Sequence, residues 1–192
     1  MRVGITGGIG SGKSLVGEVL QRMGFPLYSS DIRAKQLVES DLELRQRIVA
    51  LLGAEAYTSQ GCYNKPYVAQ RVFANPNLLQ QLNALIHPVV AIDFVQWVSA
   101  QPVRLVFLES AILFESHFDQ MVDAVVAITA PDEVRIQRVM RRNGAVRQQV
   151  EQRMSAQMPT NELCQRANFV IQNDGEHLLI PQIVNVLNRL LQ

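Results

Sequence analysis

The residues with the clearest chemistry lie near the amino terminus, in the run Gly7-Gly8-Ile9-Gly10-Ser11-Gly12-Lys13-Ser14. The run matches G-x-x-x-x-G-K-[ST], and its glycines allow the backbone to close around an anion because no Cβ obstructs positive φ. Backbone N–H groups and the positive end of a helix dipole then point at the β-phosphate. Lys13 neutralises β- and γ-oxygens, and the Ser14 hydroxyl is a natural Mg²⁺ ligand. The run therefore predicts a cradle for the phosphates of Mg-ATP.

The context of this motif agrees with that interpretation. An apolar run at residues 2–6 predicts a strand before it, and apolar periodicity over residues 14–23 predicts a helix after it. The alternative is a glycine-rich turn that binds nothing. Such a turn needs one or two glycines, whereas four of the six residues from Gly7 to Gly12 are glycine and Lys-Ser follows.

Two carboxylates follow predicted strands, where open parallel sheets bind their ligands. Asp31 follows the second strand, and Glu109 follows Leu105-Val106-Phe107-Leu108 in the manner of a Walker B acid. A kinase needs a carboxylate to take the proton of the acceptor hydroxyl and acids to order Mg²⁺. Asp31 is equally suited to cap the following helix, and Glu109 to be a structural acid. Position alone leaves both alternatives open.

Arginines are concentrated in the last third of the chain. Between Pro131 and Val170 there are seven arginines and no lysine. Arg135, Arg138 and Arg142 have i, i+3, i+7 spacing, which places them on one helix face. Because guanidinium makes planar, two-pronged contacts that lysine cannot, this composition indicates phosphate binding by at least one of these arginines.

The order of elements predicts an α/β fold with a parallel sheet and helices on both faces. Further strands are expected at Pro26-Leu27-Tyr28 and at residues 103–108, 124–129 and 169–171, and further helices at 131–142, 146–158 and 178–191. The region from Asp31 to Ala100 has helical periodicity almost throughout, punctuated by Gly61, Pro66 and Pro88, and predicts a helical insertion beside the sheet.

Composition places limits on the environment and the partners. The chain has 192 residues, an apolar fraction of 48%, a charged fraction of 18% and a net charge of +1. No overall field favours nucleic acid or anionic membranes. No secretion signal precedes the first strand, no run approaches a membrane span, and Cys62 and Cys164 are isolated. We expect a soluble, cytoplasmic protein with reduced, buried thiols.

These segments together resemble the dephospho-coenzyme A kinase family over nearly the whole chain. The opening Gly4-Ile5-Thr6 through Ser14 is similar to the family's P-loop, and further matches are Val72-Phe73, His87-Pro88 and Leu113-Phe114-Glu115. The resemblance implies Asp31 as catalytic base, Arg138 and Arg142 as lid arginines, Gln157 as the lid glutamine and Asn173 near the adenine. It also implies contacts from Leu15 to the nucleotide and from His87, Glu115 and Gln157 to the substrate.

The resemblance implies a three-part P-loop kinase with ATP and Mg²⁺ as cofactors. Its parts are a nucleotide core over residues 1–30, 101–130 and 167–192, a helical substrate domain over 31–100 and an arginine-rich lid over 131–166. The expected reaction is phosphorylation of the ribose 3′-hydroxyl of dephospho-coenzyme A, the last step of coenzyme A synthesis. No nucleic-acid or membrane partner is expected, and the sequence leaves monomer and homo-oligomer equally open.

Some residues depart from the family pattern. Ser29 stands where many members have an acid, so Asp31, Ser14 or waters must suffice for Mg²⁺. Leu15 replaces a threonine, Arg135 a common glutamine and Asn168 an aspartate, and Ala111-Ile112 replaces Pro-Leu. His87 is alternatively a core histidine at a helix start.

Two other functions share the phosphate cradle. One is another small P-loop kinase, acting on a nucleoside monophosphate or a polyol. The other is a non-catalytic protein that senses ATP, which would need no base in line with an acceptor.

Overall fold

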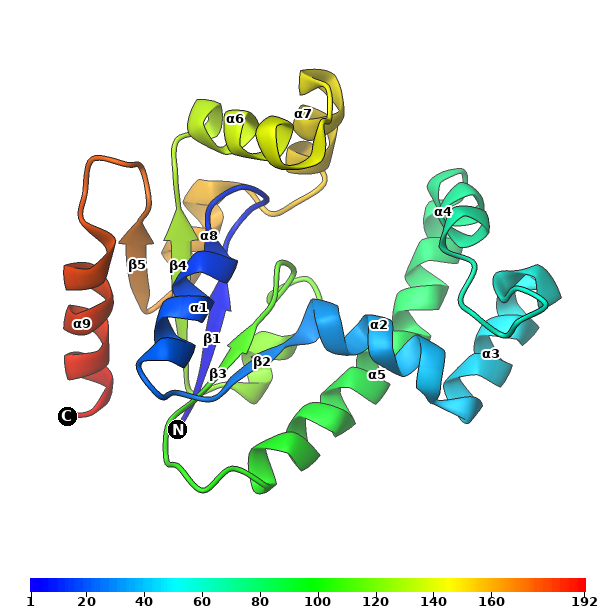
Figure 1. Cartoon of the computed structure of the whole chain (residues 1–192), viewed down its shortest axis with the longest axis horizontal. Coiled ribbons are helices and arrows are strands. Elements are labelled where there is room, and N and C mark those ends of the chain that lie inside the picture. Colours follow the sequence, from blue (N-terminus) through cyan, green and yellow to red (C-terminus); the bar gives the residue numbers. More distant parts are fainter. The chain divides into compact units, whose positions relative to one another are not determined.

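The structure is a computed structural model that describes residues 1–192 (Figure 1). The chain divides into two compact units, which we describe separately: one comprises residues 1–29 and 101–192, and the other residues 30–100. We call them the nucleotide unit and the helical unit. The helical insertion predicted for residues 31–100 begins one residue later than the second of these units.

A parallel sheet is the framework of the nucleotide unit, as the order of elements predicts (Figure 1). Its five strands have the order β2-β3-β1-β4-β5, and all neighbours are parallel. The strands are β1 (Arg2–Thr6), β2 (Leu27–Ser29), β3 (Val106–Glu109), β4 (Ala124–Thr129) and β5 (Phe169–Gln172). β3 begins three residues later than expected, because Val103 is exposed and the chain bends over residues 102–104.

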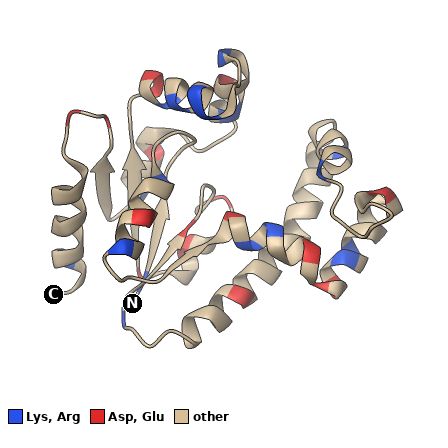
Figure 2. Ribbon diagram, in the orientation of Figure 1, with Lys and Arg blue, Asp and Glu red and all other residues tan.

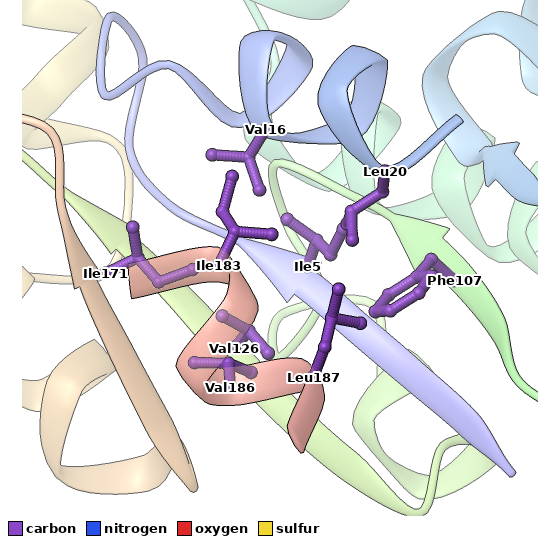
Figure 3. Close-up of a pocket in the computed structure, with 9 residues that line it drawn as sticks. All are labelled: Ile5, Val16, Leu20, Phe107, Val126, Ile171, Ile183, Val186 and Leu187. Atoms are coloured by element: carbon purple, nitrogen blue, oxygen red, sulfur yellow. The ribbon is translucent and has the colours of Figure 1, made fainter. Parts of the chain in front are cut away.

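One face of this sheet is covered by α1 (Lys13–Arg22) and α9 (Leu179–Leu190). Alternate residues of the strands, among them Ile5, Val126 and Ile171, meet Val16 and Ile183 from these helices. Figure 3 shows their side chains converging on a small apolar cavity of about 10 Å³. Burial of this layer fixes α1, and with it the loop before α1, against the sheet.

The opposite face of the sheet packs on the segment that follows β3. Leu113 is fully buried, and a Cβ placed on Gly4 would lie 2.7 Å from its side chain. The 3-10 helix η2 (Phe118–Met121) belongs to this segment and contacts β1. Glycine at position 4 therefore allows the chain after β3 to lie flat on the central strand.

Three helices follow β4: α6 (Asp132–Asn143), α7 (Arg147–Ser155) and α8 (Thr160–Arg166). Gly144 caps the carboxyl end of α6, and its φ of 63° lies in the left-handed region that favours glycine. α7 ends three residues earlier than predicted, and α8 was not predicted at all. α8 has seven residues and one buried side chain, Leu163, so its apolar pattern is too short to show helical periodicity.

The helical unit contains α2 (Ser30–Ser40), α3 (Leu42–Leu52), the 3-10 helix η1 (Ala54–Ala56), α4 (Lys65–Phe73) and α5 (Pro76–Ser99). Its core is formed by Leu44, Ile48, Leu52, Val68 and Leu82 with their apolar neighbours. Tyr57 donates a hydrogen bond of 2.7 Å to the carbonyl of Val38, and burial raises the pKa of its hydroxyl to about 12. Pro88 lies inside α5 and does not end it, contrary to its predicted role as punctuation.

Two expectations from the sequence need correction, namely that no run approaches the length of a membrane span and that both thiols are buried. By length and composition one helix, α5, could cross a membrane, with 24 residues and a mean hydropathy of 1.4 over its most apolar window. A single helix of this kind is weak evidence, since helices of soluble proteins meet the same criteria. α5 packs on α2, α3 and α4, and its Asp93 pairs with Arg33 of α2. The thiols are also less buried than expected: Cys62 is exposed and Cys164 half-buried.

Candidate active site

The predicted phosphate cradle is the turn that joins β1 to α1. Gly10 and Gly12 have φ values of 80° and 99°, in the left-handed region that favours glycine. Ser11 donates its N–H to the carbonyl of Gly8 at 3.1 Å, which closes the turn. Gly12 is the residue before the helix, so α1 begins at Lys13, one residue earlier than predicted. The motif lysine and serine thus occupy the first turn of a helix, where free N–H groups attract anions.

Side chains from distant parts of the chain hold the outside of this loop. Gln157 accepts a hydrogen bond of 2.7 Å from the N–H of Ile9, and Arg135 Nε donates one of 3.0 Å to the carbonyl of Ile9. Asn173 Nδ2 donates to the carbonyl of Ser11 at 2.8 Å. Arg138 Nη1 lies 3.5 Å from the carbonyl of Gly10. The loop is therefore held in shape by side chains that the sequence places far from it.

A hydroxyl and a carboxylate meet at the end of the sheet. Ser14 Oγ donates a hydrogen bond of 2.9 Å to Glu109 Oε1, at the carboxyl end of β3. Oxygen ligands of these two kinds are those that Mg²⁺ prefers. Ser14 and Glu109 thus fit a magnesium ion bound beside the phosphates.

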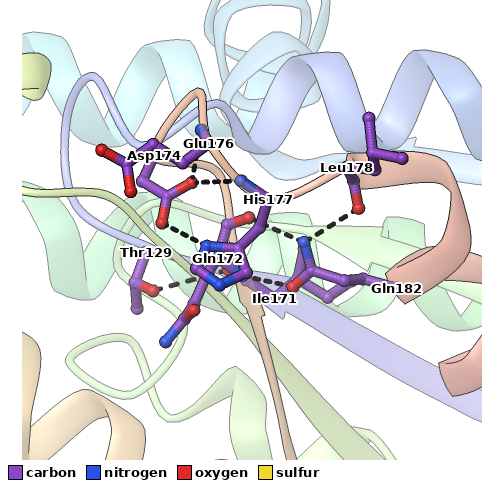
Figure 4. Close-up of polar contacts among 8 residues, drawn as sticks. All are labelled: Thr129, Ile171, Gln172, Asp174, Glu176, His177, Leu178 and Gln182. Atoms are coloured by element: carbon purple, nitrogen blue, oxygen red, sulfur yellow. Dashed lines mark hydrogen bonds and ion pairs between the residues drawn. The ribbon is translucent and has the colours of Figure 1, made fainter.

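Asn173 belongs to a loop whose shape is fixed by polar contacts (Figure 4). The next residue, Asp174, accepts hydrogen bonds from the N–H groups of Glu176 and His177 and from the His177 ring. These bonds, that from the N–H of His177 foremost, hold the pKa of Asp174 far below its usual value. Gln182 of α9 bonds to both the N–H and the carbonyl of Gln172. The contacts stabilise the turn that carries Asn173 to the phosphate loop.

The three arginines with shared spacing on α6 have different environments. Arg135 is 5% exposed and also donates to Asp132 and Thr160, at 2.9 and 3.1 Å. Arg138 lies beside the loop, and Arg142 donates to the neighbouring Asn143. Arg135 therefore serves the loop's backbone, which leaves Arg138 and Arg142 as the candidates for phosphate.

Another arginine of this region is engaged in ion pairs. Figure 2 shows acidic residues interspersed among the basic ones on α6 and α7. Arg147 of α7 pairs with Glu133 and Glu151 at 2.7 and 2.8 Å, and its side chain is half-exposed. Its hydrogen bonds hold the pKa of Glu133 below the usual value. Arg147 thus connects α6 to α7 at the surface.

The segment from Gln157 to α8 is attached to the rest of the unit by several contacts. Glu115 accepts a hydrogen bond of 3.1 Å from the N–H of Met158. The Arg166 guanidinium lies 4.1 Å from the Phe114 ring and 3.5 Å from Asp119. Glu115 and Gln157, which the resemblance assigns to substrate, both bind backbone N–H groups. The sequence gives no signal for these contacts, because their partners are backbone groups far along the chain.

Asp31 and His87 lie in the helical unit. α2 begins at Ser30, so Asp31 occupies its first turn instead of the capping position considered from the sequence. An acid there is favoured by the helix dipole. His87 lies in the interior of α5, not at a helix start. Arg33 of α2 pairs with Asp93 of α5.

The parallel sheet, its phosphate loop and the arginine-bearing helices define a P-loop kinase. The sequence matches the family model described as dephospho-CoA kinase over residues 1–178, and the chain belongs to that family. The dephospho-CoA kinase of Bacteroides fragilis is 44% identical over 193 residues, covering 100% of this chain and 94% of that protein. That of Porphyromonas gingivalis is 40% identical, covering 96% and 92%.

Solved structures have the same fold. A crystal structure of a Thermus thermophilus protein covers 100% of this chain with a TM-score of 0.85 and 32% identity, and the match takes in 96% of that protein. A dephospho-CoA kinase from Campylobacter jejuni has a TM-score of 0.71 at 22% identity, with 98% and 96% covered. The predicted fold class and family are therefore confirmed.

Proposed function

We propose that this chain transfers the γ-phosphate of ATP to the ribose 3′-hydroxyl of dephospho-coenzyme A. The observation that carries the proposal is the β1–α1 loop, with Lys13 and Ser14 at the helix start and Glu109 bonded to Ser14, in a chain of the dephospho-CoA kinase family. Relatives with 40–44% identity that the chain covers almost completely are named dephospho-CoA kinase.

The nucleotide unit supplies the groups that bind ATP. The backbone N–H groups of the loop would surround the phosphates, and Lys13 would place its charge on the β- and γ-oxygens. Ser14 and Glu109 would hold Mg²⁺, which neutralises charge on the phosphates when bound. Arg138 and Arg142 would stabilise the charge spread over the transferring group. Leu15 and Asn173 would complete the nucleotide site beside the loop.

The helical unit supplies the acceptor site in this proposal. Asp31 would accept the proton of the 3′-hydroxyl as that oxygen attacks the γ-phosphorus, while the bond to the leaving ADP oxygen breaks. His87 of the helical unit is proposed to contribute to acceptor binding, as are Glu115 and Gln157 of the nucleotide unit. The division into core, helical substrate domain and lid over residues 131–166 is part of the same proposal. The long pantetheine arm would provide binding energy that aligns the hydroxyl.

An ADP-release assay with a panel of acceptors tests the proposal. Dephospho-coenzyme A, AMP, adenosine and shikimate are each supplied with Mg-ATP, and products are identified by mass spectrometry. We expect one phosphate added to dephospho-coenzyme A and far slower turnover of the others. Rapid phosphorylation of AMP or shikimate with dephospho-coenzyme A unmodified would contradict the proposed acceptor. Binding of ATP without turnover of any acceptor would favour an ATP sensor.

A further inference from the structure

The geometry around the phosphate loop points to a role for Arg135 that its position on α6 does not reveal. The Arg135 guanidinium is almost completely buried and donates from Nε to the carbonyl of Ile9. Gln157 takes the N–H of the same residue. Side chains from residues 131–166 therefore bind both the N–H and the carbonyl of Ile9.

Because the peptide group is planar, a bond to the carbonyl of one residue also fixes the direction of the N–H of the next residue. In a trans peptide the carbonyl of one residue and the N–H of the next point in opposite directions, and the chain has no cis peptide. Arg135 binds the carbonyl of Ile9 from outside the loop, so the N–H of Gly10 is turned the other way. Asn173 binds the carbonyl of Ser11 and in the same manner turns the N–H of Gly12.

The neighbouring peptide has a separate function. Gln157 accepts from the N–H of Ile9, so the carbonyl of Gly8 points away from Gln157, and it accepts the N–H of Ser11 at 3.1 Å. The N–H groups of Ile9 and Ser11 are thus used within the protein. The N–H groups of Gly10 and Gly12 donate to no backbone carbonyl, so they are among the donors that the loop can offer to phosphate.

We propose that Arg135 is a positioning residue for ATP, acting through its Nε–H, which fixes the Ile9–Gly10 peptide so that the Gly10 N–H points at the phosphates. The inference rests on the proposed binding of ATP. Its other bonds, from Nη1 to Asp132 and Thr160, attach the same side chain to the starts of α6 and α8. They contribute to stability and are not needed for the orientation.

Two substitutions of Arg135 distinguish the contribution of its Nε–H from that of the rest of its side chain. The amide nitrogen of glutamine stands at the same distance along the side chain as arginine Nε, and the terminal methyl of methionine occupies that position without a donor. Arg135→Gln and Arg135→Met both lose the contacts of Nη1 and differ in the bond to Ile9. We expect both to melt at similar temperatures, below the wild type.

The decisive measurement is the affinity for ATP by isothermal titration, together with KM values. We expect Arg135→Met to raise the Kd and KM for ATP about tenfold to a hundredfold, the effect of one lost hydrogen bond to a charged group. Arg135→Gln should stay within about threefold of the wild type, and KM for the acceptor should change little in either. Equal ATP affinities for the two variants would overturn the inference, whereas a wild type that binds no ATP would overturn the proposed function instead.

Controls come from the same region. Thr160→Val removes an acceptor of Nη1, and Arg147→Gln removes two surface ion pairs, with Glu133 and Glu151. Neither substitution changes the bond from Arg135 to Ile9. We expect both to leave the ATP affinity unchanged.

If Arg135→Met does not fold, the wild type still provides a test. ADP should shift the NMR signal of the Gly10 amide strongly and that of Ile9 little. A strong shift of Ile9 with none at Gly10 would overturn the inference.

Discussion

At the scale of single residues, the glycines of the phosphate loop are required by what packs outside it as well as by their own conformations. A Cβ on Gly8 would lie 2.1 Å from Arg135 Nη2 and 2.8 Å from its Cζ. A Cβ on Gly10 would lie 2.5 Å from the Arg135 carbonyl, and Gly10 also has a φ of 80°. The first conflict involves the end of a side chain and the second involves backbone, so only the first can be relieved by substitution.

This difference predicts a double-mutant result. Gly8→Ala should destabilise the wild type by about 1–3 kcal/mol, because the new methyl overlaps a buried guanidinium. In an Arg135→Gln background the same change should cost at least about 1 kcal/mol less, since glutamine ends before Cζ and Nη2. Gly10→Ala should not be rescued. Urea unfolding of the single and double variants measures the coupling, and additive effects at Gly8 would contradict the packing.

The sequence predicts the loop itself because its chemistry is local: eight consecutive residues carry both the conformation and the charge. It does not predict the role of Arg135, whose spacing with Arg138 and Arg142 suggested a common function. Burial and a backbone partner separate Arg135 from the other two. Such contacts depend on how α6 lies against the loop, which no local pattern specifies.

At the scale of elements, α6 is a helix as predicted. The arginines of α6 and α7 differ in their environments, so their substitution should affect catalysis differently. Arg142→Lys should lower kcat/KM about tenfold or more, because an ammonium cannot make the two-pronged phosphate contact proposed for guanidinium. Arg138→Lys should behave similarly. Arg147→Lys, in a half-exposed pair with Glu133 and Glu151, should change kcat/KM less than about twofold. Steady-state kinetics at varied ATP concentration measures kcat/KM for each variant. Equal losses in all three variants would indicate a diffuse basic surface instead of a specific phosphate contact.

α9 provides a matched pair for the packing of the sheet. Ile183 is 1% exposed and lines the apolar cavity in Figure 3, whereas Val184 on the same helix is 37% exposed. Ile183→Ala should lower the free energy of unfolding by about 2–5 kcal/mol because it enlarges a void that the neighbours cannot fill. Val184→Ala should cost well under half of that. Thermal or urea unfolding measures both, and similar losses would show that α9 does not pack as described.

Element boundaries were predictable where burial is strongly periodic, as in β4, which has the expected bounds. The boundaries of short or exposed elements were not predictable in this way. α8 buries one side chain, and the strand expected over residues 103–108 begins only at Val106, because residues 102–104 form a bend. Pro88 shows the opposite case, because the packing of α5 on three neighbouring helices outweighs the lost backbone bond.

At the scale of the whole molecule, the proposed chemistry is divided between two compact units. Lys13 lies in the unit with the sheet, and Asp31 lies in the helical unit, two residues after the end of β2. The sequence predicts this division, because helical periodicity replaces the strand–helix alternation between residues 31 and 100. The sequence also offers two roles for Asp31, catalytic base or helix cap. In the structure α2 begins at Ser30, so the Asp31 carboxylate lies in the first turn of the helix.

The division predicts that two substitutions fail in different ways. Lys13→Ala removes the charge on the β- and γ-phosphates, so it should abolish turnover and weaken ATP binding while the fold persists. Asp31→Asn keeps the size of the side chain but cannot take a proton, so kcat should fall about 10²- to 10⁴-fold with ATP affinity unchanged. Titration calorimetry with ATP and steady-state kinetics on both variants separate binding from transfer. A fall in kcat of less than about tenfold in Asp31→Asn would remove Asp31 as the base, because a carboxylate that only favours the helix start contributes no proton transfer. Near-normal turnover by a folded Lys13→Ala protein would instead contradict the role of the phosphate loop, on which every other part of the mechanism depends.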